Sequence, residues 1–227
     1  MKLDKQSLAA IIDQTLLKPD ATGVEVMQFC LEAGKLGFAS VCISPLYVRT
    51  AKELLIGTPV KITTVIGFPS GTESREAKID EAKNAVEGGA DELDIVMNPE
   101  LAKAGKWDDV QKEIEEIIVA TPDTVHKVII EACNLTDDEK KSAALAVMNA
   151  GAEYVKTSTG FGSGGATVAD VELIHSVTEG KIGIKAAGGI KTLEDVISFI
   201  EAGATRLGTS SGVQLVNGLG GAGIIIG

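Results

Sequence analysis

The sequence predicts an α/β protein with the architecture of a (β/α)8 TIM barrel. Short apolar runs alternate with amphipathic stretches along the chain, which is the pattern of parallel βα units. Eight such runs occur, and a glycine-containing loop recurs between them. The length of 227 residues is near the roughly 250 residues typical of this barrel. We therefore expect residues 1–227 to form one domain.

The candidate strands are short runs rich in apolar or β-branched residues. They span residues 9–15, 38–44, 60–68, 91–97, 126–132, 152–158, 181–187 and 204–210. Segments with helical spacing lie between them, among them 74–87, 107–119, 136–150, 167–177 and 192–202. An open, doubly wound sheet is the alternative that this alternation also permits.

Helix boundaries are marked by capping residues. Thr136 with Glu139, and Thr167 with Asp170, have the spacing of capping boxes, whereas Ser74 is a weaker start. Glycines that suit the left-handed residue after a helix stand at Gly89, Gly151 and Gly203. The repeated glycine indicates that one βα unit is reused along the chain.

Polar residues gather where the predicted strands end. They are Asp13, Thr15, Asp94, Asn98, Glu131, Lys156, Lys185, Ser210 and Ser211. In a TIM barrel the carboxyl ends of the strands carry the active site. This placement favours the barrel over the open sheet.

Lys156 and Lys185 are the strongest indication of function. Each stands in an otherwise apolar or small-residue strand, and the two strands follow one another along the chain. Ammonium groups are rarely buried without compensation, and one cation depresses the pKa of a neighbouring amine. A neutral lysine amine is the nucleophile of Schiff-base chemistry. Snorkelling of each lysine to solvent is the structural alternative.

Asp94 is the candidate proton-transfer residue. Strand alternation places it with Glu92 and Val96 on the face opposite Leu93 and Ile95, and that face can point into a barrel. A carboxylate near two lysines could hold one of them as an ammonium. A structural ion pair is the alternative. Asp13 and Thr15 are weaker candidates for a supporting role.

Three glycine-rich segments follow the last predicted strands, at 160–165, 188–191 and 208–212. In barrels a phosphate commonly binds to backbone amides of the loops after strands seven and eight. The segment 160–165 also fits the GxGxxG dinucleotide pattern, but it follows five earlier strands rather than opening the first βα unit. Tight turns are the alternative for any single loop.

Composition excludes several classes of function. The formal net charge of -11 argues against a nucleic-acid partner. No segment approaches the roughly 18 apolar residues of a membrane span, and no long apolar signal segment begins the chain, so we expect a cytoplasmic protein without a membrane partner. Three cysteines lack CxxC spacing and two histidines form no HExxH motif. We expect core cysteines and no metal.

Over nearly its whole length the chain resembles the bacterial deoxyribose-phosphate aldolases. The similar segments are IDQTLLKPDAT (12–22), KITTVIGFPSG (61–71), GADELDIVMN (89–98), KVIIEA (127–132), VKTSTGF (155–161), GIKAAGGIKT (183–192) and GATRLGTSSG (203–212). The resemblance implies a cofactor-free class I aldolase. Its reaction is the reversible cleavage of 2-deoxy-D-ribose 5-phosphate into D-glyceraldehyde 3-phosphate and acetaldehyde.

By the same resemblance, the Schiff-base lysine is Lys156, the second active-site lysine is Lys185 and the acidic proton-transfer residue is Asp94. Asp13 and Thr15 correspond to groups that support the second lysine. The phosphate-binding residues implied are Gly160, Phe161, Gly188, Gly189, Gly208, Ser210 and Ser211. A homo-oligomer is compatible with this assignment.

The chain departs from the family pattern at three places. Gln14 replaces a histidine that many members carry, and the tail 218–227 has no terminal tyrosine. Phe161 stands where some members have a lysine beside the phosphate, so backbone amides and Lys191 are expected to contribute more here. Three other functions remain open: a transaldolase-like Schiff-base enzyme, a nicotinamide oxidoreductase, and a barrel that binds sugar phosphates without catalysis.

Overall fold

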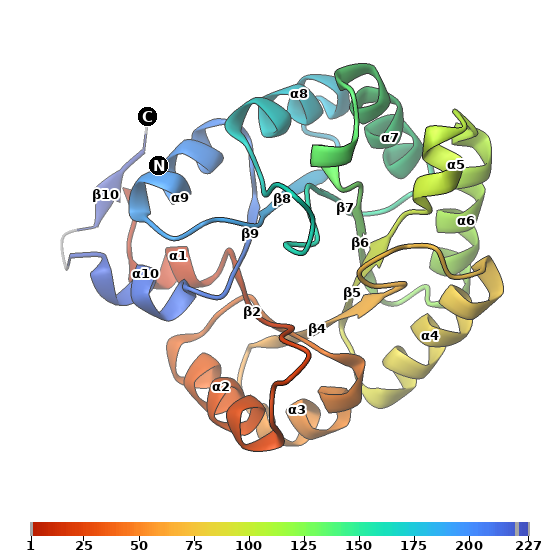
Figure 1. Cartoon of the computed structure of the whole chain (residues 1–227). Coiled ribbons are helices and arrows are strands. Elements are labelled where there is room, and N and C mark those ends of the chain that lie inside the picture. The colour runs from red at the N-terminus through yellow and green to blue at the C-terminus, as the bar shows by residue number, and fades with distance from the viewer. Residues whose placement is uncertain (1, 221–222, 227) are drawn as a thin grey trace.

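The computed structural model describes residues 2–220 and 223–226 and contains a closed barrel of eight parallel strands (Figure 1). In order around the barrel these are β2 (Ile12–Leu16), β3 (Ser40–Ile43), β4 (Lys61–Ile66), β5 (Glu92–Val96), β6 (Val125–Ile129), β7 (Tyr154–Lys156), β8 (Gly183–Ala187) and β9 (Arg206–Thr209). β9 pairs with β2 and closes the ring. The closure confirms the predicted barrel and excludes the open sheet.

Helices surround the strands on the outside of the ring (Figure 1). They are α1 (Lys5–Ala9), α2 (Gly23–Leu36), α3 (Val48–Leu54), α4 (Arg75–Gly88), α5 (Pro99–Lys103), α6 (Trp107–Ala120), α7 (Asp137–Asn149), α8 (Val168–Thr178), α9 (Leu193–Glu201) and α10 (Gly212–Gly218). Single 3-10 turns occur at η1 (Pro45–Tyr47) and η2 (Ala132–Asn134). No helix among the described residues is long and apolar enough to cross a membrane.

Two predicted strand boundaries are wrong by three residues, whereas the others lie within two residues of the structure. The first strand begins at Ile12 rather than residue 9, because a capping box between Asp4 and Ser7 starts helix α1, which ends at Ala9. The strand predicted to extend to residue 132 ends at Ile129, because the chain then enters the 3-10 turn η2. Local hydrogen bonds override the apolar pattern at both places.

The helix signals agree better with the structure. Thr136 and Glu139 form a complete capping box, whereas Asp170 bonds to the hydroxyl of Thr167 rather than to its backbone amide. The predicted left-handed glycines have positive φ angles of 106° at Gly89, 89° at Gly151 and 110° at Gly203. Only glycine adopts these conformations at little cost.

The apolar core lies between the strands and the surrounding helices. Outward-facing residues such as Leu93, Ile95, Val128 and Leu207 are fully buried there. The inside of this barrel differs from the usual pattern. A TIM barrel is normally filled by branched apolar side chains. Here ionisable side chains from six strands meet inside it.

A second, two-stranded sheet brings the ends of the described chain together. β1 (Lys2–Leu3) pairs antiparallel with β10 (Ile224–Ile225), beside α1 and α10 (Figure 1). The sequence pattern predicted neither strand. Such short strands form only because distant segments meet, so no local periodicity marks them.

Candidate active site

Lys156 and Lys185 lie side by side at the centre of the barrel. They are direct partners in the register between β7 and β8. Lys156 Nζ lies 2.7 Å from Asp94 Oδ2, and Lys185 Nζ lies 2.6 Å from the same oxygen. Because both amines bond to the same oxygen, the distance between Lys156 Nζ and Lys185 Nζ cannot exceed the sum of these two distances. Their side chains are 3% and 0% exposed, which excludes snorkelling.

Asp94 is inward-facing, as strand alternation predicted, and completely buried. Its second carboxylate oxygen accepts a hydrogen bond of 3.0 Å from Lys127 on the neighbouring strand β6. Burial acts to raise the pKa of Asp94, but Lys127, Lys156 and Lys185 outweigh it and hold the pKa well below its ordinary value. Asp94 is therefore ionised at neutral pH.

A layer of further buried charges continues around the barrel from Asp94. Lys127 also pairs with Glu92 at 2.5 Å and with Asp13 at 3.5 Å. Asp13 in turn pairs with Lys185 at 2.5 Å and with Arg206 at 2.7 Å. We call these seven residues the buried charge layer: Asp13, Glu92, Asp94, Lys127, Lys156, Lys185 and Arg206.

The buried charge layer distinguishes the two central lysines. Burial lowers the pKa of Lys156, and the Lys185 cation lowers it further, so that Asp94 does not restore the ordinary value. Burial also acts to lower the pKa of Lys185, but Asp13 and Asp94 outweigh burial and raise it. The layer holds four basic and three acidic groups, so a neutral Lys156 balances the charge. Lys156 is thus the amine best suited to attack a carbonyl.

Lys156 opens into a cavity of about 250 Å³ at the carboxyl ends of the strands. The cavity is lined by Thr15, Leu16, Leu17, Lys18, Lys156, Thr159, Gly160, Phe161, Ala187, Gly188, Gly189, Ile190, Lys191, Gly208, Thr209 and Ser210. The loop after β7 projects toward the centre of the ring (Figure 1). A nucleophilic amine thus lies at the base of a cavity rich in backbone amides.

Known proteins with the same sequence features identify the family. Residues 7–227 match the model of the DeoC/LacD family aldolases. The chain belongs to this aldolase family. It is 50% identical over 215 residues to the deoxyribose-phosphate aldolase of Geobacillus sp. (strain WCH70), covering 94% of this chain and 96% of the relative. The corresponding values for the Streptococcus uberis enzyme are 49% over 218 residues, with 96% and 97% covered.

A solved structure supports the same family assignment. The deoxyribose phosphate aldolase of Aeropyrum pernix, described as having a unique tetrameric structure, superposes with a TM-score of 0.88. The two chains are 35% identical, and the match covers 94% of this chain and 91% of the other. The family and the fold therefore agree.

The glycine-rich loops of the aldolase contain two backbone amides that are free to bind a ligand. Gly160 and Gly189 have φ angles of 86° in each case, and neither amide has a hydrogen-bond acceptor among the described residues. A Cβ on Gly208 would lie 3.0 Å from Lys185 Cε, so glycine there leaves room for the lysine. Free amides at positive φ are typical of anion sites.

Two of the predicted phosphate-binding residues, Phe161 and Ser211, have backbone amides that are already hydrogen-bonded within the protein. The amide of Phe161 donates to Thr159 Oγ1 at 3.0 Å, and the amide of Ser211 donates to Thr209 Oγ1 at 2.9 Å. Ser211 is also absent from the cavity lining, whereas Ser210 lines it. Lys18 and Lys191 line the cavity too and are exposed, so both can offer positive charge.

The supporting residues on β2 occupy distinct positions. Asp13 contacts Lys185 directly, whereas the hydroxyl of Thr15 donates to the backbone oxygen of Asp13. Gln14 points the other way: its Nε2 donates to Ser210 O at 3.4 Å and its Oε1 accepts from the Gly212 amide at 3.0 Å. Gln14 therefore ties β2 to the loop after β9 and contacts none of the central lysines.

Sequence reasoning missed Lys127, Glu92 and Arg206 as members of the buried charge layer. The signal was present for Lys127, because it alternates with Val128 in an apolar strand in the same way as Lys156 alternates with Val155. Arg206 also stacks over the ring of Tyr154, with 5.3 Å from Cζ to the ring centre. Only the register between strands shows that these side chains meet.

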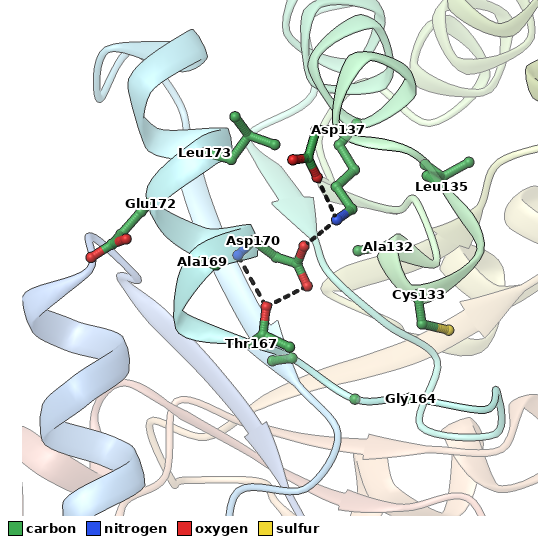
Figure 2. Close-up of a pocket in the computed structure, with 13 residues that line it drawn as sticks. Ala132, Cys133, Leu135, Asp137, Gly164, Thr167, Ala169, Asp170, Glu172 and Leu173 are labelled. Atoms are coloured by element: carbon green, nitrogen blue, oxygen red, sulfur yellow. Dashed lines mark hydrogen bonds and ion pairs between the residues drawn. The ribbon is translucent and has the colours of Figure 1, made fainter.

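A larger cavity of about 680 Å³ lies outside the barrel between α7 and α8 (Figure 2). Its central groups are already paired: Lys140 contacts Asp170 at 2.6 Å and Asp137 at 3.0 Å.

Cys133 is exposed at the edge of this outer cavity, which corrects the expectation that all three cysteines are core residues. Cys42 is buried beside Asp94, and burial together with Asp94 raises the pKa of its thiol to about 11.

We expect Lys127→Met to destabilise the protein strongly. The substitution keeps a side chain of similar length but removes the buried cation that pairs with Asp13, Glu92 and Asp94, and breaking such pairs costs about 3 to 5 kcal/mol. Urea unfolding measures the loss. Lys103→Met, which breaks the exposed pair with Glu139 at 2.8 Å, is the control and should cost less than about 1 kcal/mol. Equal effects of the two substitutions would contradict the prediction.

Proposed function

We propose that this chain is a single-domain class I aldolase that reversibly cleaves 2-deoxy-D-ribose 5-phosphate into D-glyceraldehyde 3-phosphate and acetaldehyde. The observation that carries the proposal is the sharing of Asp94 Oδ2 by Lys156 and Lys185. The relatives named above carry the same activity in their names. We place the enzyme in the cytoplasm, without nucleic-acid or membrane partners.

Catalysis begins with the neutral amine of Lys156. It attacks the C1 aldehyde of the open-chain sugar, and loss of water gives an imine that becomes protonated on nitrogen. A base then removes the proton of the C3 hydroxyl, the bond between C2 and C3 breaks, and its electron pair moves onto C2 as an enamine. D-Glyceraldehyde 3-phosphate leaves at this step.

Proton transfers complete the cycle. Asp94, Lys185 and water move the proton between the C3 oxygen, the carbinolamine and C2 of the enamine. Water then adds to the imine, releases acetaldehyde and regenerates the amine of Lys156. Asp94 supports this role because its two oxygens contact three lysines.

The 5-phosphate is assigned to the glycine-rich end of the cavity. The free amides of Gly160 and Gly189 supply hydrogen bonds, with Gly188, Gly208 and Ser210 beside them. Lys18 and Lys191 supply charge at the mouth. Phe161 and Ser211 contribute through the shape of their turns, because their amides are bonded within the protein.

Reductive trapping tests the proposal. Acetaldehyde and borohydride should place one ethyl group on the chain, and peptide mass spectrometry should locate it on Lys156. Release of acetaldehyde from 2-deoxy-D-ribose 5-phosphate, without transfer to or from ketose phosphates, separates the reaction from transaldolase chemistry. Adduct formation on Lys185 would reverse the proposed roles. NADH binding without any adduct would instead favour an oxidoreductase.

A further inference from the structure

Glu131 stands just after the end of strand β6, between β6 and the 3-10 turn η2, beside the active-site cavity. The amides of Ile130 and Ala132 donate to the oxygens of Lys156 and Thr157 at 3.0 and 2.8 Å. In a regular parallel ladder, donors two residues apart reach acceptors two residues apart. Here the acceptors are adjacent residues, so Glu131 is an extra, bulge-like residue in the segment that continues β6. Bulges of this kind redirect side chains next to active sites.

The backbone of Glu131 shows the same redirection. Its φ and ψ angles are 47° and 64°, and only one other described residue that is not glycine, Glu179, has a positive φ. The left-handed region is uncommon for residues that carry a Cβ. Gly162 leaves space for the redirected side chain, because a Cβ there would lie 3.1 Å from Glu131 Cδ.

The carboxylate of Glu131 is bonded to Thr159 on the loop after β7. The hydroxyl of Thr159 donates to Glu131 Oε2 at 2.5 Å, and its amide lies 3.3 Å from each carboxylate oxygen. The only hydroxyl hydrogen of Thr159 is therefore used by Glu131. The oxygen of that hydroxyl then accepts the amide of Phe161 at 3.0 Å.

These bonds leave one amide of the turn free. The amide of Thr159 donates to the Glu131 carboxylate, and the amide of Phe161 donates to Thr159 Oγ1. The amide of Gly160, which lies between them in the chain, has no acceptor among the described residues. Gly160 and Thr159 both line the catalytic cavity. The turn therefore presents a single unpaired amide where an anionic group of the substrate can bind.

We propose that Glu131 is a positioning residue that fixes the Thr159 to Phe161 turn, so that the Gly160 amide binds the phosphate of the substrate. This inference rests on the proposed function and adds a residue to it. A carboxylate is required, because its two oxygens accept both donors of Thr159. An amide would turn an NH2 group toward one of these donors.

The test compares three variants by calorimetric titration with inorganic phosphate. Glu131→Gln and Thr159→Val remove one part of the network with little change in volume, and each should raise the Kd for phosphate about tenfold. Thr159→Ser keeps the hydroxyl and should stay within about twofold of the unmodified protein. Equal phosphate affinity in all four proteins would overturn the inference.

Reductive trapping with acetaldehyde is the second measurement, because acetaldehyde carries no phosphate. Glu131→Gln, whose side chain does not line the catalytic cavity, should form the ethyl adduct on Lys156 at the unmodified rate, and its KM for 2-deoxy-D-ribose 5-phosphate should rise while kcat/KM for 2-deoxy-D-ribose is unchanged. Loss of the adduct together with phosphate affinity would mean that Glu131 only maintains the fold, which overturns the inference. Failure of the unmodified protein to form the adduct would contradict the proposed aldolase, and the phosphate titration would still decide the role of Glu131.

Discussion

The Lys156→Arg variant should lose at least about a thousandfold in kcat/KM and form no borohydride-trapped adduct. A guanidinium stays protonated in proteins, so it cannot act as the amine nucleophile. It can still pair with Asp94, which lies 2.7 Å from Lys156 Nζ, and the fold should be retained. Steady-state kinetics, peptide mass spectrometry and circular dichroism measure the three effects.

The control for this variant is Lys181→Arg. Lys181 is 61% exposed, pairs with Glu179 and is not among the residues that line the catalytic cavity. Its replacement should leave both kcat/KM and adduct formation unchanged. A Lys156→Arg protein that still gave an ethyl adduct would show that another amine is the nucleophile.

The second large effect is expected for Lys185→Leu. The Lys185 cation helps to lower the pKa of Lys156, and its removal also frees Asp13 and Asp94 from one partner. Both changes favour the ammonium form of Lys156, so its pKa should rise. The neutral fraction then falls at neutral pH and recovers as the pH increases.

The measurement is the pH dependence of adduct formation with acetaldehyde. Activity of Lys185→Leu at neutral pH should fall by about a hundredfold or more, and adduct formation should recover partly at alkaline pH. Recovery of turnover should stay incomplete because Lys185 is also proposed to take part in proton transfer. Lys185→Arg keeps the charge, so its adduct should follow the pH profile of the unmodified protein. An unchanged pH profile in Lys185→Leu would show that the two amines are not coupled.

Much of the geometry of the candidate site was predictable because strand alternation is a local property. Lys156, Lys185 and Asp94 stand out as ionisable residues in apolar strands, and alternation alone turns Asp94 to the inside. In the structure both lysines bond to the same oxygen of Asp94. Phosphate contacts were less predictable, because composition marks a glycine-rich loop but not which of its amides is already bonded.

The sequence by itself determined the alternation of strands and helices, the left-handed glycines at the helix ends and the two central lysines. These features depend on residues close together in the chain, whose periodicity and caps act locally. Only the tertiary structure decided which of the two amines has the lowered pKa. That outcome depends on burial and on Asp13, Asp94 and Lys127, which come from three separate strands and meet the two lysines only when the barrel closes. Charge interactions act through space, so a pKa is set by neighbours that the order of residues does not show.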